Sequence, residues 1–167
     1  MNIHKQYAKL VYEIIGAAMT VHRELNWGLL EPVYQEALSV ELISRGITNN
    51  REESIDVFYK KQKLDKQYKM DIVVNNDIIV ELKSVSHIIP AHRAQLCNYL
   101  RLTRKPIGLL INFGEEDLIC ERWALDSSSN KCFVVDKEMN PVYDVDYNKL
   151  FETNVANEHL IELLMSD

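Results

Sequence analysis

The chain has 167 residues, of which 47% are hydrophobic and 26% charged, and its 19 Lys and Arg against 25 Asp and Glu give a formal net charge of −6. This length suits one domain with a substantial core, and the composition excludes a disordered or fibrous chain. The acidic balance argues against a dedicated nucleic-acid-binding protein, because Lys and Arg make the contacts to phosphate.

The cysteines and the N-terminus indicate the compartment. Cys97, Cys120 and Cys132 show no metal-like spacing and no disulfide framework, which is typical of free thiols in a reducing compartment. The N-terminus has no signal-peptide pattern, and the uncharged stretch 14–21 is far shorter than the roughly 20 residues that span a bilayer. We therefore expect a cytoplasmic protein with no membrane partner.

The first half of the chain changes from helical to strand periodicity. Apolar residues recur at helical spacing from Tyr7 to Leu25, and Asn26-Trp27-Gly28 interrupts the pattern. A second helix is expected from about Pro32 to Gly46. Strands are then predicted at 54–60, 67–74 and 78–84, with a polar connection at 61–66 and a tight turn at 75–77.

The second half begins with a helix at 91–103, followed by the apolar run 107–113, which predicts a buried strand parallel to its neighbour because a helix intervenes. The order of elements predicts an α/β fold with a central mixed sheet flanked by helices. The remaining expected elements are an edge strand at 118–125, a polar loop at 126–130, a hairpin at 132–145 and a C-terminal helix with Leu160, Ile161, Leu163 and Leu164 on its apolar face.

Two carboxylates flank the tight turn. If its loop is the three residues 75–77, Val74 pairs with Ile78 and Asp71 falls opposite Glu81, with Cβ atoms about 4.5–5.5 Å apart. A two-residue loop without a bulge would place the two carboxylates on opposite faces of the sheet. The candidate site therefore depends on the register.

Lys83 adds a cation to this pair, because strand alternation places it on the same face as Glu81. Two close carboxylates repel and are costly in an apolar sheet unless a positive charge lies between them. Mg²⁺ suits one or two carboxylates plus waters, and Lys83 is placed to orient a water nucleophile or to neutralise charge on a phosphate. The alternative is a simple ion pair on a solvated sheet face.

Further polar residues follow in an order that fits a site. Gln95 and Tyr99 share one face of the helix 91–103, although alone they would be typical of an ordinary polar helix face. Glu31 begins the second helix, where the alternative is a carboxylate stabilised by the helix dipole. Four other residues are not assigned to the candidate site. His87 and His92 are expected to be solvated, and Trp27 and Trp123 are expected to pack in the core rather than to stack on bases.

The segment Gly28-Leu29-Leu30-Glu31-Pro32-Val33-Tyr34 contains a Gly-x-x-Glu-x-x-Tyr signature, and from about residue 5 to residue 125 the chain resembles the GxxExxY protein family. That family is similar to a compact branch of the PD-(D/E)XK nuclease superfamily with a Gln-x-x-x-Tyr motif after the Glu-x-Lys strand. Further matching segments are Tyr34-Gln35-Glu36-Ala37-Leu38, Asp71-Ile72-Val73-Val74, Glu81-Leu82-Lys83-Ser84-Val85, Gln95-Leu96-Cys97-Asn98-Tyr99-Leu100 and Gly108-Leu109-Leu110-Ile111-Asn112-Phe113-Gly114.

The resemblance implies a restriction-endonuclease-like α-β-β-β-α-β core at residues 1–126 and Mg²⁺- or Mn²⁺-dependent hydrolysis of DNA, in repair, processing or defence. A C-terminal appendage at 127–167 lies outside the pattern and would pack on the core, form a homodimer contact or block the groove. The implied residues are Glu31, Asp71, Glu81 and the Leu82 carbonyl as metal ligands, Lys83 as catalytic lysine, and Gln95 and Tyr99 as contacts to the nucleic-acid strand.

Two other functions stay open: a catalytically silent nuclease fold that binds nucleic acid or protein, and a metal enzyme acting on another phosphoester. The charge distribution removes part of the objection to nucleic acid. Residues 1–51 carry a net charge of 0, residues 52–105 carry +3 and residues 106–167 carry −9. The acidity lies in the C-terminal third, so binding of nucleic acid by the core is expected to be weak without metal and sensitive to salt.

Overall fold

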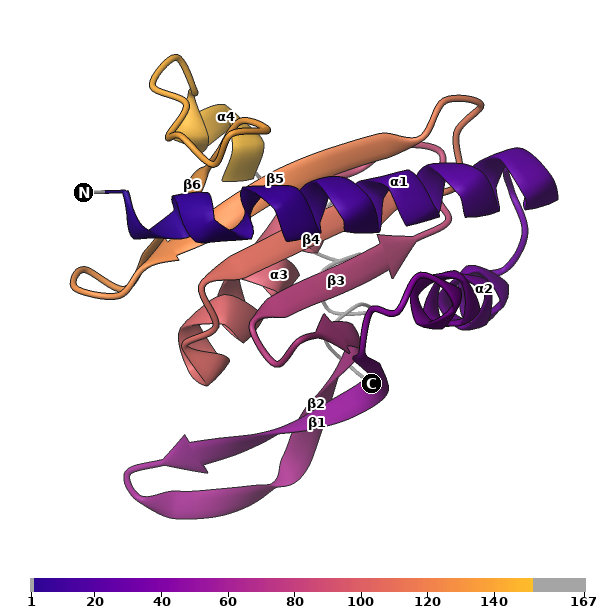
Figure 1. The fold of residues 1–167 in the computed structure, drawn as a ribbon. Helices are drawn as coiled ribbons and strands as arrows, with labels where there is room; N and C mark the ends of the chain where they lie inside the picture. Colours follow the sequence, from indigo (N-terminus) through magenta and orange to yellow (C-terminus); the bar gives the residue numbers. More distant parts are fainter. Residues whose placement is uncertain (1, 152–167) are drawn as a thin grey trace.

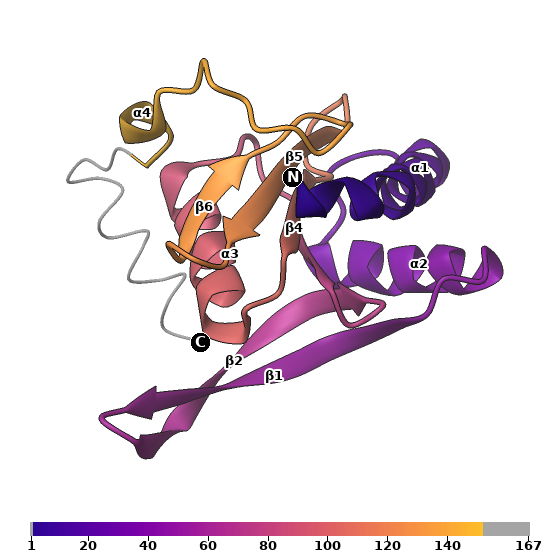
Figure 2. The same cartoon turned by 60° about the vertical axis from the view of Figure 1, so that its left-hand side comes forward.

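The computed structural model describes residues 2–151 (Figures 1 and 2). The first helices are η1 (Ile3–Tyr7), α1 (Ala8–Leu25) and α2 (Glu31–Ser44), followed by the strands β1 (Asn49–Tyr59), β2 (Gln62–Val74) and β3 (Ile78–Lys83). The later elements are α3 (Pro90–Thr103), β4 (Ile107–Asn112), β5 (Ile119–Asp126), β6 (Lys131–Val134) and α4 (Tyr147–Phe151).

The strands form one mixed sheet in the order β1-β2-β3-β4-β5-β6, in which β3 and β4 run parallel and the other neighbours antiparallel. Helices α1 and α2 bury one core against the sheet, and α3 buries a second core on the other face. Every residue of β3 and β4 is buried, because both faces of these strands are covered. The predicted α/β fold with a mixed sheet flanked by helices is confirmed.

The turn between β2 and β3 has the predicted three-residue loop. Val74 pairs with Ile78, and Asn75 and Asn76 have φ angles of 51° and 62°. Asn tolerates this left-handed region better than most residues, because its short side chain bonds locally. The register condition for bringing Asp71 beside Glu81 is therefore met.

The expected polar connection at 61–66 is wrong. β1 and β2 continue through it as one long hairpin, with Tyr59 paired to Gln62 and only Lys60 and Lys61 in the turn. Both turn lysines have positive φ, 47° and 69°, a conformation that residues other than Gly, Asn and Asp rarely adopt. The sequence shows no strand pattern here, because neither face of this ribbon is buried.

The C-terminal elements also differ from expectation. The strand expected at an edge, β5, is covered by β6. The expected hairpin at 132–145 is reduced to one antiparallel bridge, from Val135 to Pro141, flanked by backbone hydrogen bonds from Asp136 to Asn140 and from Val142 to Val134. Helix α4 packs Tyr147, Leu150 and Phe151 against the core beneath α3. The predicted helix with Leu160, Ile161, Leu163 and Leu164 lies outside the described residues. Over residues 2–151, no helix combines the length and apolarity that a bilayer-crossing segment needs.

Candidate active site

Asp71 and Glu81 lie side by side where the ladder between β2 and β3 ends. The last backbone pair of this ladder is Ile72 with Val80, and beyond it carboxylates accept the backbone N–H groups. Glu81 Oε1 accepts from the Asp71 N–H at 3.0 Å, and Asp71 Oδ2 accepts from the Leu82 N–H at 2.8 Å. These two bonds fix both side chains between the strands.

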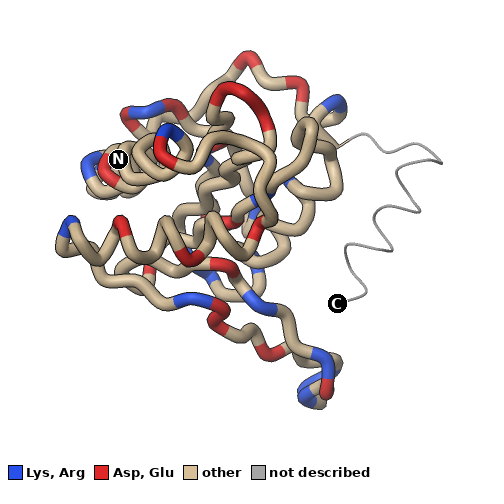
Figure 3. The backbone as a smooth tube through the Cα atoms, turned by 90° about the vertical axis from the view of Figure 1, so that its right-hand side faces the viewer, with Lys and Arg blue, Asp and Glu red and all other residues tan. Residues whose placement is uncertain are grey.

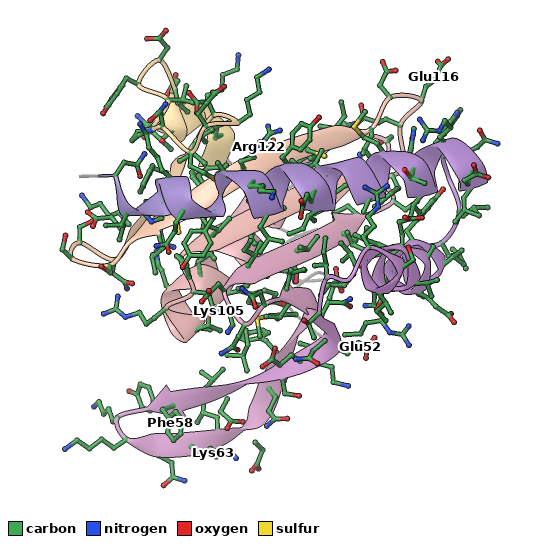
Figure 4. The ribbon with its side chains drawn as sticks, in the orientation of Figure 1. Glu52, Phe58, Lys63, Lys105, Glu116 and Arg122 are labelled. Carbon is green, nitrogen blue, oxygen red and sulfur yellow. The ribbon has the colours of Figure 1, made fainter. Side chains whose placement is uncertain are left out.

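Asp71 also marks the point at which the β1–β2 hairpin leaves the body of the sheet. The pairs on either side are Arg51 with Ile72 and Glu53 with Met70, and the residue between them in β1, Glu52, has a φ of 53°. A left-handed residue interrupts the regular pleat. The interruption lies opposite Asp71, so the carboxylate is placed at a bend rather than within a regular ladder (Figure 4, Glu52).

Lys83 is buried on the same strand as Glu81, and their side chains are only 7% and 3% exposed. Its Nζ donates to Gln95 Oε1 of α3 at 3.0 Å. The Lys83 charge lowers the pKa values of both Asp71 and Glu81, although burial outweighs it. The structure thus brings Glu81, Lys83 and Gln95 together as the sequence predicted.

Tyr99 lies one turn after Gln95 but is buried, with 4% of its surface exposed. Burial raises the pKa of its hydroxyl, with a smaller effect from Glu81, while a hydrogen bond with Gln95 acts in the opposite direction. Its ring also contacts Tyr68 of β2, with centroids 5.7 Å apart. Tyr99 is therefore placed behind Gln95, where it supports that side chain.

Glu31, the first residue of α2, completes the acidic group. Burial, followed by the charge of Asp71, raises its pKa to about 7, and a hydrogen bond with Asp71 acts in the same direction. One turn further along α2, Gln35 Nε2 donates a long hydrogen bond of 3.5 Å to Asp71 Oδ1. Sequence reasoning missed Gln35 as a site residue. A polar residue in an amphipathic helix is expected on the exposed face, and nothing in the sequence indicates that this amide is buried.

Burial also raises the pKa values of Asp71 and Glu81, and for Glu81 the charge of Asp71 adds to the effect. Three carboxylates thus crowd around one lysine, an oxygen-rich set of the kind that hard divalent cations bind. Across residues 2–151, no three His, Cys, Asp or Glu side chains form a ready metal-binding group. The oxygens of Asp71 and Glu81 are instead turned toward backbone N–H groups.

The loop that carries Glu31 is held by the tyrosine of the same signature. The Tyr34 hydroxyl donates to the Asn26 carbonyl at 2.6 Å and accepts from the Leu29 N–H at 3.0 Å, and its ring stacks on Phe113 at 4.5 Å. Gly28 has a φ of 90°, which favours glycine, and its N–H donates to the Phe113 carbonyl. Of the Gly-x-x-Glu-x-x-Tyr residues, only Glu31 faces the carboxylates; the others position it.

Asn112 holds the segment that follows Lys83, and sequence reasoning missed it. Its Oδ1 accepts from the N–H groups of Val85 and Gly114, and its Nδ2 donates to the Val85 carbonyl, each at 3.0 Å. A Cβ at Gly114 would lie 2.2 Å from the Val85 backbone, so the two segments approach as only glycine allows. The sequence feature that could have indicated this role is that Asn112 is the one polar residue in the apolar run 107–113.

Two expectations about residues near the site are wrong. His92 is buried rather than solvated: its Nδ1 accepts from the Ile89 N–H at 3.1 Å, and burial, followed by the charge of Lys83, lowers its pKa to about 4. Trp27 is 56% exposed because it lies in the loop before α2, whereas Trp123 is fully buried as predicted. Trp27 is thus a surface residue four positions before Glu31.

A comparison with protein families identifies the superfamily of this chain. A family model described as the PD-(D/E)XK nuclease superfamily matches residues 8–123. The chain belongs to the PD-(D/E)XK nuclease superfamily. Asp71 and the Glu81-Leu82-Lys83 segment present the Asp and Glu-x-Lys of the superfamily's name, whereas Met70 stands where that name has Pro.

A search among curated proteins finds no matching sequence. Among solved structures, one titled "Crystal structure of SSO0001" aligns with 96% of this chain and 78% of its own, at 13% identity and a TM-score of 0.48. This likeness is too distant to support any statement about function. The superfamily assignment therefore depends on the family match, and the site on the geometry described above.

Proposed function

We propose that this member of the PD-(D/E)XK superfamily is a metal-dependent nuclease that hydrolyses phosphodiester bonds of DNA, and that it belongs to the GxxExxY group. One observation carries the proposal: Asp71 and Glu81 lie against each other on neighbouring strands, with Lys83 buried beside them. Burying such a group of charges lowers the stability of the fold, so its presence indicates a functional site or a bound cation that offsets the cost. The setting that we propose is DNA repair, processing or defence.

The donor set fits Mg²⁺ or Mn²⁺, with Glu31, Asp71, Glu81 and the Leu82 carbonyl as the residues that would hold it. Burial raises the pKa of all three carboxylates, and the charge of Asp71 adds to the effect at Glu31 and Glu81; a bound cation would offset both costs, which supports this assignment. When bound, such an ion polarises a phosphoryl oxygen and lowers the pKa of a coordinated water.

Lys83 would act on the scissile phosphate directly. An ammonium group has three donors, and Gln95 accepts one of them, so the others are available to a phosphate oxygen or to the attacking water. Gln95 orients the ammonium group, Tyr99 supports Gln95, and Tyr34 and Asn112 fix the two loops around the site. The exposed Trp27 is available to contact a base of the substrate.

The decisive experiment is cleavage of labelled single- and double-stranded DNA with Mg²⁺ or Mn²⁺, and with EDTA. We expect Lys83→Ala and Asp71→Asn to lower the rate by about 100-fold or more, because each removes charge from the reacting centre. The matched controls are Lys137→Ala and Glu116→Gln, both exposed (Figure 4 shows Glu116), which should cleave like the wild type. Equal, EDTA-insensitive cleavage by wild type and site variants would exclude the proposal.

Calorimetry separates the nuclease from a catalytically silent module. We expect Mg²⁺ or Mn²⁺ to bind the wild type and to bind Glu81→Gln far more weakly, because Glu81 is the most buried of the carboxylates. An absence of binding at millimolar metal would favour the module. Labelled RNA of the same sequence tests the choice of DNA as substrate.

A further inference from the structure

The far end of the β1–β2 hairpin extends beyond the rest of the described chain (Figures 1 and 2). Ile55 of β1 and Met70 of β2 are the last buried residues before the tip, and none of residues 56–69 is buried. We call residues 56–69 the hairpin arm. No side chain of the arm is buried, so packing of the core does not account for the presence of the arm.

The arm is basic, in contrast to the chain as a whole. It holds five lysines and two aspartates, which gives it a net charge of +3 in a protein of net charge −6. Figure 3 shows Lys and Arg gathered at its end, at the lower right. Among the described residues, Lys63 forms an ion pair with Asp56 at 3.6 Å, and none is recorded for Lys60 or Lys61.

The two turn residues are not the ones that would make the hairpin most stable. Lys60 and Lys61 both have positive φ, the arrangement of a type I′ turn, for which Asn-Gly is the favoured sequence. Lysine offers no backbone advantage at either position. Two cations at the most protruding point of the molecule, kept in an unfavourable backbone conformation, point to a function that needs their charge.

Aromatic side chains accompany this charge. Phe58 and Tyr59 are 61% and 62% exposed, and as neighbours in a strand they point to opposite faces of the ribbon. Phe58 lies opposite Lys63 in the ladder (Figure 4), and Lys60 Nζ lies 5.5 Å from the centre of the Tyr59 ring. Lysines interleaved with exposed aromatic rings are typical of surfaces that bind nucleic acid.

The base of the arm is joined to the candidate site. Tyr68 of the arm contacts Tyr99, and Asp71 lies three residues further along β2. From Asp71 to Gln62 the strand has nine residue steps, which span at most about 30 Å at about 3.3 Å each. That reach equals about nine base pairs of B-DNA, at about 3.4 Å per pair.

We propose that the hairpin arm binds double-stranded DNA, with its two-stranded ribbon in the major groove within about one helical turn of the phosphate held at Asp71, Glu81 and Lys83. The major groove is about 12 Å wide and admits a ribbon of this kind. Lys60 and Lys61 then contact phosphates at the groove edge. The inference rests on the proposed nuclease function, because that function places DNA at the base of the arm.

The test compares binding of duplexes of two lengths by the full chain in EDTA, at about 50 mM salt, using fluorescence anisotropy. For a duplex of about 30 base pairs, we expect Lys60→Glu/Lys61→Glu to weaken binding at least 10-fold and to reduce the salt slope. A duplex of about 8 base pairs cannot reach from the site to the tip, so wild type and variant should bind it equally. Lys131→Glu/Lys137→Glu, with the same change in charge outside the arm, should bind the long duplex within 2-fold of wild type.

A second variant separates binding from folding. Lys60→Asn/Lys61→Gly installs the favoured turn sequence and removes two charges, so it should fold at least as well as wild type and still bind the long duplex several-fold more weakly. Wild-type affinity in this variant would overturn the inference. Equal losses on single-stranded and duplex DNA would also overturn it, because groove binding requires a duplex.

Failure of the inference can be told apart from failure of the proposed function. Hydrolysis of bis(p-nitrophenyl) phosphate, a small phosphodiester, depends on the site and not on the arm. Arm variants should hydrolyse it like wild type, whereas Asp71→Asn should not. If wild type cleaves DNA and the arm variants bind it normally, the inference alone is wrong; if Asp71→Asn cleaves normally, the proposed function is wrong.

Discussion

The centre of the sheet and the hairpin arm belong to the same sheet but are stabilised differently. Every residue of β3 and β4 is buried between two helical layers, whereas no residue of the arm is buried. The centre is fixed by packing on both faces, and the arm by the backbone ladder and by pairs of side chains. The centre can therefore position reacting groups to within fractions of an ångström, while the arm is suited to contacts that tolerate movement.

The candidate site lies at the boundary between these regions. Glu81 and Lys83 belong to the rigid centre, and Asp71 lies at the bend where the hairpin leaves it. Side chains placed here are held by the core on one side and, under the proposed function, would face the substrate on the other.

The largest difference is expected for the same substitution in each region. Leu109→Ala in β4 should lower the free energy of unfolding by about 2–5 kcal/mol, because it leaves a cavity in a fully buried strand. Leu64→Ala in the arm, where the side chain is 38% exposed, should lower it by less than about 0.5 kcal/mol. Urea unfolding of both variants measures the difference, and similar losses would contradict the division into two regions.

The next largest effect is a pH-dependent change in the free energy of unfolding that Glu31 causes in the absence of metal. Because its pKa in the folded protein is raised from 4.5 to about 7, the folded state binds this proton more tightly than the unfolded state does. The contribution of Glu31 to the free energy of unfolding therefore falls as pH rises from about 4.5 to about 7. Glu31→Gln should thus be more stable than wild type at pH 8 by about 1–2 kcal/mol and equal to it at pH 4.

Urea unfolding in EDTA at pH 4, 6 and 8 gives the comparison. Glu36→Gln, on the exposed face of the same helix, is the matched control and should stay within about 0.5 kcal/mol of wild type at each pH. Adding Mg²⁺ at pH 8 should stabilise wild type more than Glu31→Gln. A Glu31→Gln variant less stable than wild type at pH 8 would show that the carboxylate stabilises the fold.

The smallest effect is expected at the turn of the arm. Lys60→Asn/Lys61→Gly should raise the free energy of unfolding by up to about 1 kcal/mol, since it relieves two left-handed lysines. Part of this gain is local, so hydrogen exchange of the amides in 58–64 is the more sensitive measurement. Faster exchange in the variant than in wild type would contradict the type I′ assignment.

The sequence predicted the centre of the molecule better than its periphery. The apolar runs of β3 and β4 and the Asn-Asn turn each have a local physical cause, so the α/β order followed from them, and the register of Asp71 against Glu81 followed on condition of the three-residue loop that the structure shows. The arm could not be predicted, because a strand with no buried face has no period-2 pattern. The burial of His92, the exposure of Trp27 and the part played by Asn112 depend on neighbours distant in sequence.

The charge of the chain is likewise divided between local sequence and tertiary structure. The sequence by itself determined the fold class, the superfamily resemblance and the position of the acidic residues in the C-terminal third, because periodicity, turn chemistry and charge are local properties of a chain. Only the tertiary structure placed Glu31 and Gln35 beside Asp71 and distributed the lysines of 60–69 along an extended ribbon. Those contacts join residues that are far apart along the chain, and only packing of the whole sheet brings them together.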